Sequence, residues 1–344
     1  MNSSNPTARP RVTIADIAKQ AGVSPGAVSF ALNGRPGVSE ATRERILAVA
    51  RANNWQPNTA ARALVGARAG VVGLAINRPA RTLGSEAFFA DLISGVQAGL
   101  APTRTATHLR IAAGLDDELQ IYREWSSSQQ VDGVVVIDPR DDDPRFPLLA
   151  ELGLPAIVLG SHPAGPDSPA AVWIDDTATA DTLFAYLAAL GHDRIAYVSG
   201  PAEFEHTALR CAALQRVAGD AGTWTATGYA PAAAAAATRT LLSSERPTAI
   251  VYDNDVMAVA GLRVAQEMGV AVPADVSIAS FDDSVMASLV HPSLTAMTRD
   301  TFELGALAAS TLLAQLDAGA EPVPSIPGPT PALTVRESTA PPAR

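Results

Sequence analysis

The N-terminal region begins with apolar residues at helical spacing. From Ile14 to Ala21 they recur every three or four positions and fall on one face of a helix. Thr13, followed three residues later by an acidic residue, is a capping-box pattern at its start, and Gly22 ends it. Ser24 and Pro25 suit the first turn of a second helix, where the N–H that proline lacks would be unpaired anyway. Two short helices across a Gly-containing turn predict a helix-turn-helix, whose second helix enters the major groove of DNA.

A third helix is expected next, capped by Ser39, with apolar residues of segment 46–53 on one face. Residues 57–66 then have helical propensity, but the segment is shorter than the roughly 12–15 residues that a lone helix needs in water. We therefore expect a linker that becomes helical only when another surface supports it.

From Val71 onward, short β-branched runs alternate with helix-like segments. The runs expected to form strands are 71–76, 109–113, 133–137, 156–159, 171–174, 195–199, 249–252 and 277–281. The segments expected to form helices are 88–100, 177–190, 207–218, 232–242 and 256–268. This alternation predicts parallel sheets covered by helices, and the number of strands favours two sheets. Ligands of such sheets bind beyond the carboxyl ends of the strands, and here also between the two lobes.

The charge is distributed unevenly along the chain. The 344 residues carry a net charge of −10, which alone argues against a nucleic-acid partner. Residues 1–68, however, hold nine basic and three acidic residues, a net of +6 that leaves −16 for the rest. A basic N-terminal region attracts phosphates while an acidic remainder is repelled by the duplex. A small helical domain with an ordinary basic surface is the alternative.

Composition excludes several other classes. The single cysteine, Cys211, rules out intrachain disulfides and is compatible with the cytosol. No apolar run approaches the length of a membrane span, and the first residues lack the apolar segment of a secretory signal. We expect a cytoplasmic protein with no membrane partner. A sugar-binding protein of the transport type would need such a signal and would lack the helix-turn-helix.

An enzyme is also disfavoured. The five histidines show no H-x-x-x-H spacing, and neither a G-x-G-x-x-G nor a Walker sequence occurs. We therefore predict no catalytic residues, no metal site and no cofactor.

The order of motifs resembles the LacI/GalR family of bacterial transcription regulators. The matching segments are VTIADIAKQAGVS, VSE-x-TRERILA, VGLAI, AFFADLISGV, DGVVVI, LGHDRIAYVSGP, NDVMAVAGLRVAQEMGVAVPADVSIASFDDS, HPSLTAMTRD and VREST. The resemblance implies an all-α helix-turn-helix domain (12–57) after a disordered arm (1–11), then a hinge helix (58–68). It further implies an α/β periplasmic-binding-protein-like core (69–340) with an N-lobe of about 69–166, a C-lobe of about 167–295 and a return near 299–340.

The family resemblance also implies a homodimer on a two-fold symmetric DNA operator, controlled by a small effector between the lobes. Repression is the commoner mode in this family. The chain ends without a heptad extension of the kind that tethers two dimers, so we expect a dimer rather than a tetramer.

The resemblance assigns DNA contacts to positions in the helix-turn-helix and the hinge. The positions matching phosphate contacts are Thr13, Ser24, Ser29, Asn33, Ser39 and Thr42, and the hinge positions are Asn58, Ala61, Arg62 and Leu64. Leu64 would wedge a central base step in the minor groove, with Arg62 adding a contact. Where relatives carry large polar residues on the recognition helix, this chain has Pro25, Gly26 and Phe30, none of which hydrogen-bonds a base edge through its side chain. Gly26 would then allow close backbone approach, and Phe30 either contacts a thymine methyl or packs in the domain core.

The resemblance places the effector among residues of several loops. They are Phe88, Phe89, Arg210, Asn254 and Asp282. A ring with converging Arg, Asn and Asp side chains suits a hydroxyl-rich ligand, a sugar or related polyol. A core role for Phe89 is an equal alternative.

Three neighbouring positions qualify this assignment. Asp255 and Asp283 each begin a helix-like run and are expected to be helix caps. Glu86 precedes Ala87 where relatives commonly have Asn-Pro, so this wall of the pocket is expected to differ from theirs.

Overall fold

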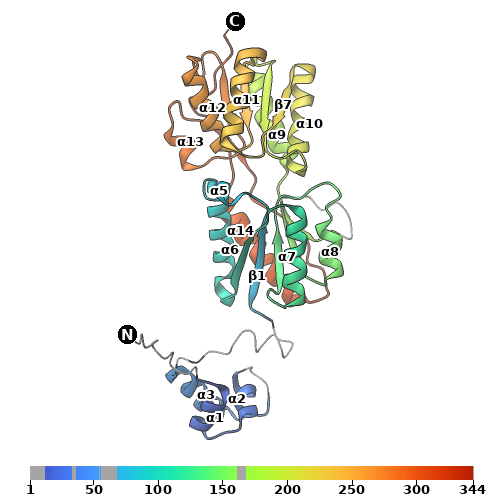
Figure 1. Ribbon diagram of the computed structural model, residues 1–344, viewed down its shortest axis with the longest axis vertical. Coiled ribbons are helices and arrows are strands. Elements are labelled where there is room, and N and C mark those ends of the chain that lie inside the picture. The colour runs from blue at the N-terminus through green and yellow to red at the C-terminus, as the bar shows by residue number, and fades with distance from the viewer. Residues whose placement is uncertain (1–11, 33–35, 54, 56–67, 161–167, 344) are drawn as a thin grey trace, which may run out of the picture. The chain divides into compact units, whose positions relative to one another are not determined.

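The computed structural model describes residues 12–32, 36–53, 55, 68–160 and 168–343. The chain divides into two compact units, residues 1–69 and 70–344, called here the head and the body (Figure 1). Within the described part of the chain, no helix is long and apolar enough to cross a membrane.

The head contains α1 (Ile14–Ala21), α2 (Pro25–Leu32) and α3 (Glu40–Ala52). The predicted capping box is confirmed: Thr13 accepts from the backbone of Asp16, whose carboxylate accepts from the backbone of Thr13. Gly22 ends α1 with a positive φ of 67°, a conformation that glycine adopts without steric cost. Ser39 caps α3 as predicted. The apolar faces of the three helices meet in one small core around Ile17, Val28 and Ile46.

The first lobe of the body is a parallel sheet in the order β11-β5-β4-β3-β1-β2. Its strands are β1 (Val71–Ile76), β2 (Ala106–Ile111), β3 (Gly133–Val136), β4 (Ala156–Gly160), β5 (Ala170–Trp173) and β11 (Ile326–Pro327). Its helices are α5 (Ala80–Leu83), α6 (Ala87–Leu100), α7 (Leu115–Ser127), α8 (Arg145–Glu151) and α14 (Thr301–Ala318). One apolar cluster packs α6 and α14 on the sheet, and a second cluster packs α7 and α8.

The second lobe has the sheet order β12-β10-β9-β8-β6-β7, parallel except for the pair β10–β12. Its strands are β6 (Ile195–Ser199), β7 (Thr223–Ala226), β8 (Ala249–Tyr252), β9 (Ser277–Ser280), β10 (Thr295–Thr298) and β12 (Ala332–Thr334). Its helices are α9 (Asp176–Ala189), α10 (Glu205–Ala218), α11 (Pro231–Thr240), α12 (Asp255–Glu267) and α13 (Val285–Leu289). Helices cover both faces here as well.

Helices α6 and α14 pack unusually closely because both carry glycine at their contact. A Cβ at Gly95 would collide with the backbone carbonyl of Phe302, and one at Gly305 would collide with the carbonyl of Leu92. The C-terminal α14 is thereby held in the first lobe, next to a helix more than two hundred residues earlier in the chain.

The predicted fold class, a helix-turn-helix head and two parallel-sheet lobes, is confirmed, while several details are corrected. The first crossing between lobes was expected near residue 166, but β5 still pairs with β4, so the chain crosses only after Trp173. The expected return over 299–340 is divided, because α14 and β11 belong to the first lobe and β12 to the second. Strand β2 lies three residues earlier than expected at its start, and α7, α8, α14, β7 and β10 had not been predicted.

Candidate functional site

The carboxyl ends of both sheets face one pocket of about 760 Å³. Its walls come from the loops that follow β1, β3 and β5 in the first lobe and β6, β7, β8, β9 and β10 in the second. This is where open α/β sheets bind ligands, and both lobes contribute to it.

Arg78, directly after β1, links the two lobes across the pocket. Its guanidinium forms an ion pair with Asp138 at 2.8 Å and lies over the ring of Tyr229 at 4.4 Å and that of Phe204 at 4.9 Å. Asp138 and Tyr229 both have positive φ angles, 50° and 64°, which non-glycine residues rarely adopt. Such strain persists where the surrounding contacts enforce it, and it is concentrated at functional sites.

Arg210 of α10 is the second buried cation of the pocket. Its guanidinium donates to Asp253 and, at 3.0 Å, to Asp176, and it lies 4.3 Å from the centre of the Phe281 ring. Asp253 also accepts from the Tyr197 hydroxyl and from the backbone of Gly200. Burial opposes ionisation of Asp253, but Arg210 and the hydrogen bonds outweigh it and hold its pKa well below the usual value.

His206, on the same helix as Arg210, contacts the Tyr229 hydroxyl through Nε2 at 2.8 Å. Burial and the neighbouring Arg210 lower the pKa of His206. The imidazole is therefore neutral at pH 7 and adds no positive charge to the pocket.

Two further carboxyl groups are less well compensated. Burial raises the pKa of Glu86 to about 8, against the opposing effect of Arg78. Burial also raises the pKa of Asp282 to about 6, although Arg299 lies 3.3 Å away. Oε1 of Glu86 has no hydrogen-bond partner among the described residues.

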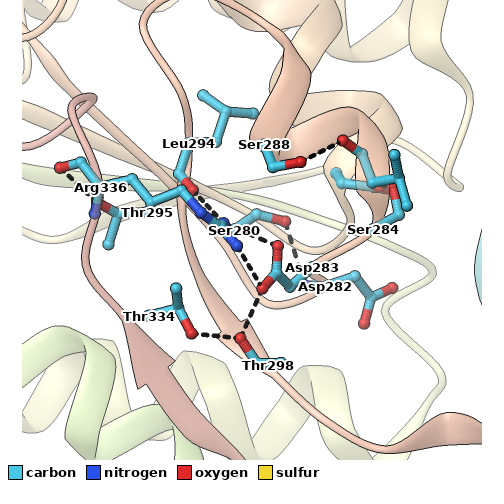
Figure 2. A network of polar contacts seen from close by, with 12 residues as sticks. Ser280, Asp282, Asp283, Ser284, Ser288, Leu294, Thr295, Thr298, Thr334 and Arg336 are labelled. Carbon is cyan, nitrogen blue, oxygen red and sulfur yellow. Dashed lines mark hydrogen bonds and ion pairs between the residues drawn. The ribbon is translucent and has the colours of Figure 1, made fainter.

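The acidic residue next to Asp282 has a different environment, as Figure 2 shows. Asp283 forms a bidentate ion pair with Arg336, both contacts at 2.8 Å, and accepts from Thr298. The side chain of Asp282 extends away from this network (Figure 2). Asp283 thus links the loop after β9 to the segment after β12, whereas the side chain of Asp282 lines the pocket.

The helix caps expected at Asp255 and Asp283 were wrong. Asn254 precedes α12 in an extended conformation, and its Oδ1 accepts from the backbone of Met257 at 2.9 Å. Ser284 caps α13 in the same way and also donates to Asp255. In each case the cap is the residue in extended conformation before the helix, and the aspartate lies one position away from it.

The structure brings together three of the five predicted effector residues. Phe88, Arg210 and Asp282 line the pocket. Phe89 is 1% exposed and packs in the core of the first lobe, in keeping with the alternative stated for it. Asn254 is buried as the cap of α12 and is not among the residues that line the pocket. The lining residues that the sequence did not indicate include Arg78, Asp138, Asp176, His206, Tyr229 and Asp253.

In the head, three of the predicted phosphate-contacting hydroxyls, those of Thr13, Ser24 and Ser39, lie at the helix starts. Ser24 accepts from the backbone of Ala27, and the hydroxyls of Ser39 and Thr42 contact each other at 2.9 Å. Side chains and free N–H groups at helix starts are suited to phosphate oxygens. Ser29 lies half-buried on α2.

Phe30 is 42% exposed on the recognition helix α2, so it does not pack in the head core. Gly26 lies exposed one turn earlier on the same helix. The remaining predicted DNA contacts, Asn33, Asn58, Ala61, Arg62 and Leu64, lie outside the described residues, as does most of the hinge.

Family models match both parts of the chain. Residues 13–58 match the model described as "Bacterial regulatory proteins, lacI family", and residues 184–339 match a periplasmic binding protein-like domain. The HTH-type transcriptional regulator CelR of Thermobifida fusca is 31% identical over 313 residues, which cover 86% of this chain and 89% of that protein.

Solved structures show the same architecture. A CelR–cellobiose complex is 26% identical with a TM-score of 0.70, covering 95% of this chain and 100% of that one. A lac repressor dimer bound to operator and the anti-inducer ONPF has a TM-score of 0.80 at 24% identity, over 96% of this chain and 99% of that one. The chain therefore belongs to the LacI family, as a DNA-binding transcriptional regulator with an effector-binding core rather than an enzyme.

Proposed function

We propose that the protein is a cytoplasmic repressor that binds a two-fold symmetric operator as a homodimer and answers to a sugar or related polyol. The observation that carries the effector proposal is a pocket built by both lobes, with an aromatic ring beside paired carboxylates and guanidinium groups. An effector that binds one arrangement of the lobes more tightly than the other can change operator affinity by at most the ratio of its two binding constants.

The sugar class is supported by the chemistry of the pocket wall. Phe88 is only half-buried, so its ring offers an apolar face to a sugar ring. Charged carboxylate and guanidinium groups form the strong, paired hydrogen bonds that vicinal hydroxyls accept and donate. The CelR structure, a relative of this chain, is described as a complex with cellobiose.

The DNA-binding part is tested by selecting operators from random duplex DNA with the full chain. A palindromic site is expected, with affinity that falls steeply as salt rises because bound phosphates release counterions. A variant lacking residues 1–66 is the control and is expected to bind no operator. Sequence-specific binding by this variant would contradict the proposal, and activated rather than repressed transcription from a promoter containing the site would contradict repression.

The homodimer is supported by exposed apolar side chains on one short helix of the second lobe. Val285 and Leu289 of α13 are 72% and 77% exposed. We expect light scattering to give a dimer and Leu289→Asp to shift it toward monomer. Met268→Asp, at the end of α12, is the matched control and is expected to leave the dimer intact. A monomeric or tetrameric wild-type protein would contradict this part of the proposal.

A further inference from the structure

We propose that Glu86 and Asp282 form an acidic subsite for a protonated amine, and that the effector is an amine-bearing sugar or polyol. The inference rests on the proposed function, because it takes the pocket between the lobes as the effector site. It goes further by assigning the effector a charge.

Glu86 has no structural role that would explain its burial. It is 7% exposed and lines the pocket, and its Oε1 has no hydrogen-bond partner among the described residues. It stands at the start of α6 but forms no side-chain capping bond there. A buried carboxyl that neither caps a helix nor accepts a hydrogen bond costs free energy in the empty pocket, and a ligand that pairs with it recovers that cost.

The nearby guanidinium groups are each paired with a carboxylate other than Glu86, although the Nε–H of Arg78, Arg210 and Arg299 has no acceptor among the described residues. Arg78 is paired with Asp138 and lies between aromatic rings, and Arg210 is shared by Asp176 and Asp253. Arg299 lies 3.3 Å from Asp282 and also donates to the backbone carbonyl of Phe281 at 3.0 Å. Glu86 is therefore left without a cation of its own.

The charge balance of the whole pocket points the same way. The residues that line it include six carboxyl groups and three guanidinium groups. A smaller pocket of about 330 Å³ shares Phe88, Asp282 and Arg299 with it and adds Asp91 and Asp255 to the lining. Burial raises the pKa of Glu86 to about 8, so its carboxyl holds a proton at neutral pH. An anionic ligand would oppose ionisation of Glu86 further, whereas an ammonium group beside it would stabilise the carboxylate and pair with it directly.

The geometry around Glu86 suits an ammonium group in particular. Phe88 lies two residues after Glu86 and lines both pockets, so an aromatic side chain for a cation–π contact borders the same space. Asp282 comes from the other lobe and extends away from the Asp283–Arg336 network (Figure 2). An amine between Glu86 and Asp282 would thus contact both lobes and favour the arrangement in which these two carboxyl groups are close.

The test compares matched ligands on the full chain. Glucosamine, galactosamine and the basic iminosugar 1-deoxynojirimycin are compared with glucose, galactose and glucose 6-phosphate, by melting temperature and by calorimetric titration. At least one amine is expected to bind ten-fold or more tightly than its neutral parent, with the phosphate weakest. Glu86→Gln is expected to abolish that ratio while keeping the fold, because the amide has the same shape without the charge. Glu151→Gln, a substitution at an exposed position at the end of α8, is the control and should keep the ten-fold preference for the amine.

Three results would overturn the inference: no amine of the panel binds, neutral parents bind as tightly as their amines, or Glu86→Gln keeps the amine preference. If neutral sugars bind and release the operator while amines do not, the amine inference fails and the proposed function stands. If the operator itself is not bound, the proposed function fails, whichever sugars bind the body.

Discussion

Removal of the buried Arg145 guanidinium is expected to destabilise the first lobe strongly. Arg145, at the start of α8, has a side chain only 2% exposed. It pairs with Asp143 at 2.6 Å and with Glu118 at 2.8 Å, and these two carboxylates are 0% and 1% exposed. It also donates to the backbone carbonyls of Ile137 at 2.9 Å and Asp138 at 2.8 Å. Arg145→Met would leave two buried carboxylates without a cation.

Breaking a buried ion pair from one side costs about 3–5 kcal/mol. At roughly 2–4 °C per kcal/mol for a domain of this size, the melting temperature should fall by about 6–20 °C. Unfolding can be followed by tryptophan fluorescence, because Trp125 is fully buried in the apolar cluster that packs α7 and α8 on the sheet. Its ring lies 6.1 Å from the ring of Tyr122, whose hydroxyl donates to Glu118. Arg145 also holds the loop that presents Asp138, so we expect the variant to answer its effector less well.

The control is another ion pair of the same lobe with the same substitution. Arg110 and Glu124 are 2.6 Å apart but 36% and 44% exposed. Solvent screens such a pair, so Arg110→Met should cost at most about 1 kcal/mol. Equal losses in the two variants would refute the argument that burial makes the Arg145 network matter. Adding Glu118→Gln to Arg145→Met should recover part of the loss, since one uncompensated charge is removed.

Three further predictions concern the pocket, the recognition helix and the hinge. The pKa of Glu86 is about 8 in the folded protein and near 4.5 in the unfolded chain, so between these pH values the folded state holds an extra proton and the wild type loses stability as the pH rises. The melting temperature of Glu86→Gln should therefore be several degrees above that of the wild type at pH 8.5 and equal to it at pH 4. A difference in melting temperature that is constant at all pH values would contradict this prediction. Phe30→Ala, at an exposed position, should leave the free energy of unfolding within about 0.5 kcal/mol but weaken operator binding ten-fold or more, and a large drop in melting temperature would instead indicate a core role. Leu64→Ala should weaken specific binding far more than non-specific binding, as competition with random DNA would show, and equal losses would mean that Leu64 is no wedge.

The parts of the fold that were predicted correctly are those with local signals. The cap at Thr13, the glycine that ends α1 and the cap at Ser39 are each determined within four residues, and all three are in the structure. Helix α14 was not predicted because it is apolar on most sides, and its position depends on the distant Gly95 of α6. The lobe boundary, which was expected from the family resemblance, was misplaced by a few residues because no local signal in the sequence marks the crossing. Only the pairing of β5 with β4 shows where the crossing lies.

The site was predictable only where a family motif covered it. Phe88 and Asp282 stand in such motifs, Arg210 was assigned by its position relative to them, and all three line the pocket. Arg78 and Asp138 follow strands too, but nothing local shows that they pair with each other or that Arg78 reaches Tyr229 of the other lobe. Arg210 also has a larger structural role than the predicted ligand contact. It holds two buried carboxylates, so replacing it with Ala is expected to destabilise the body as well as to remove a ligand contact.

This distinction between satisfied and unsatisfied groups bears on how the pocket selects its ligand. A site rejects an analogue strongly when the missing contact leaves one of the site's own buried polar groups unpaired. Asp138, Asp176 and Asp253 are each paired with an arginine of the protein itself, so we expect their contacts to differ little between one ligand and another. Glu86 has no partner among the described residues and depends on the ligand for one. Discrimination between effectors should therefore rest on Glu86 more than on the carboxylates that the arginines already hold, and substitutions there should change which effector is answered while operator binding is kept.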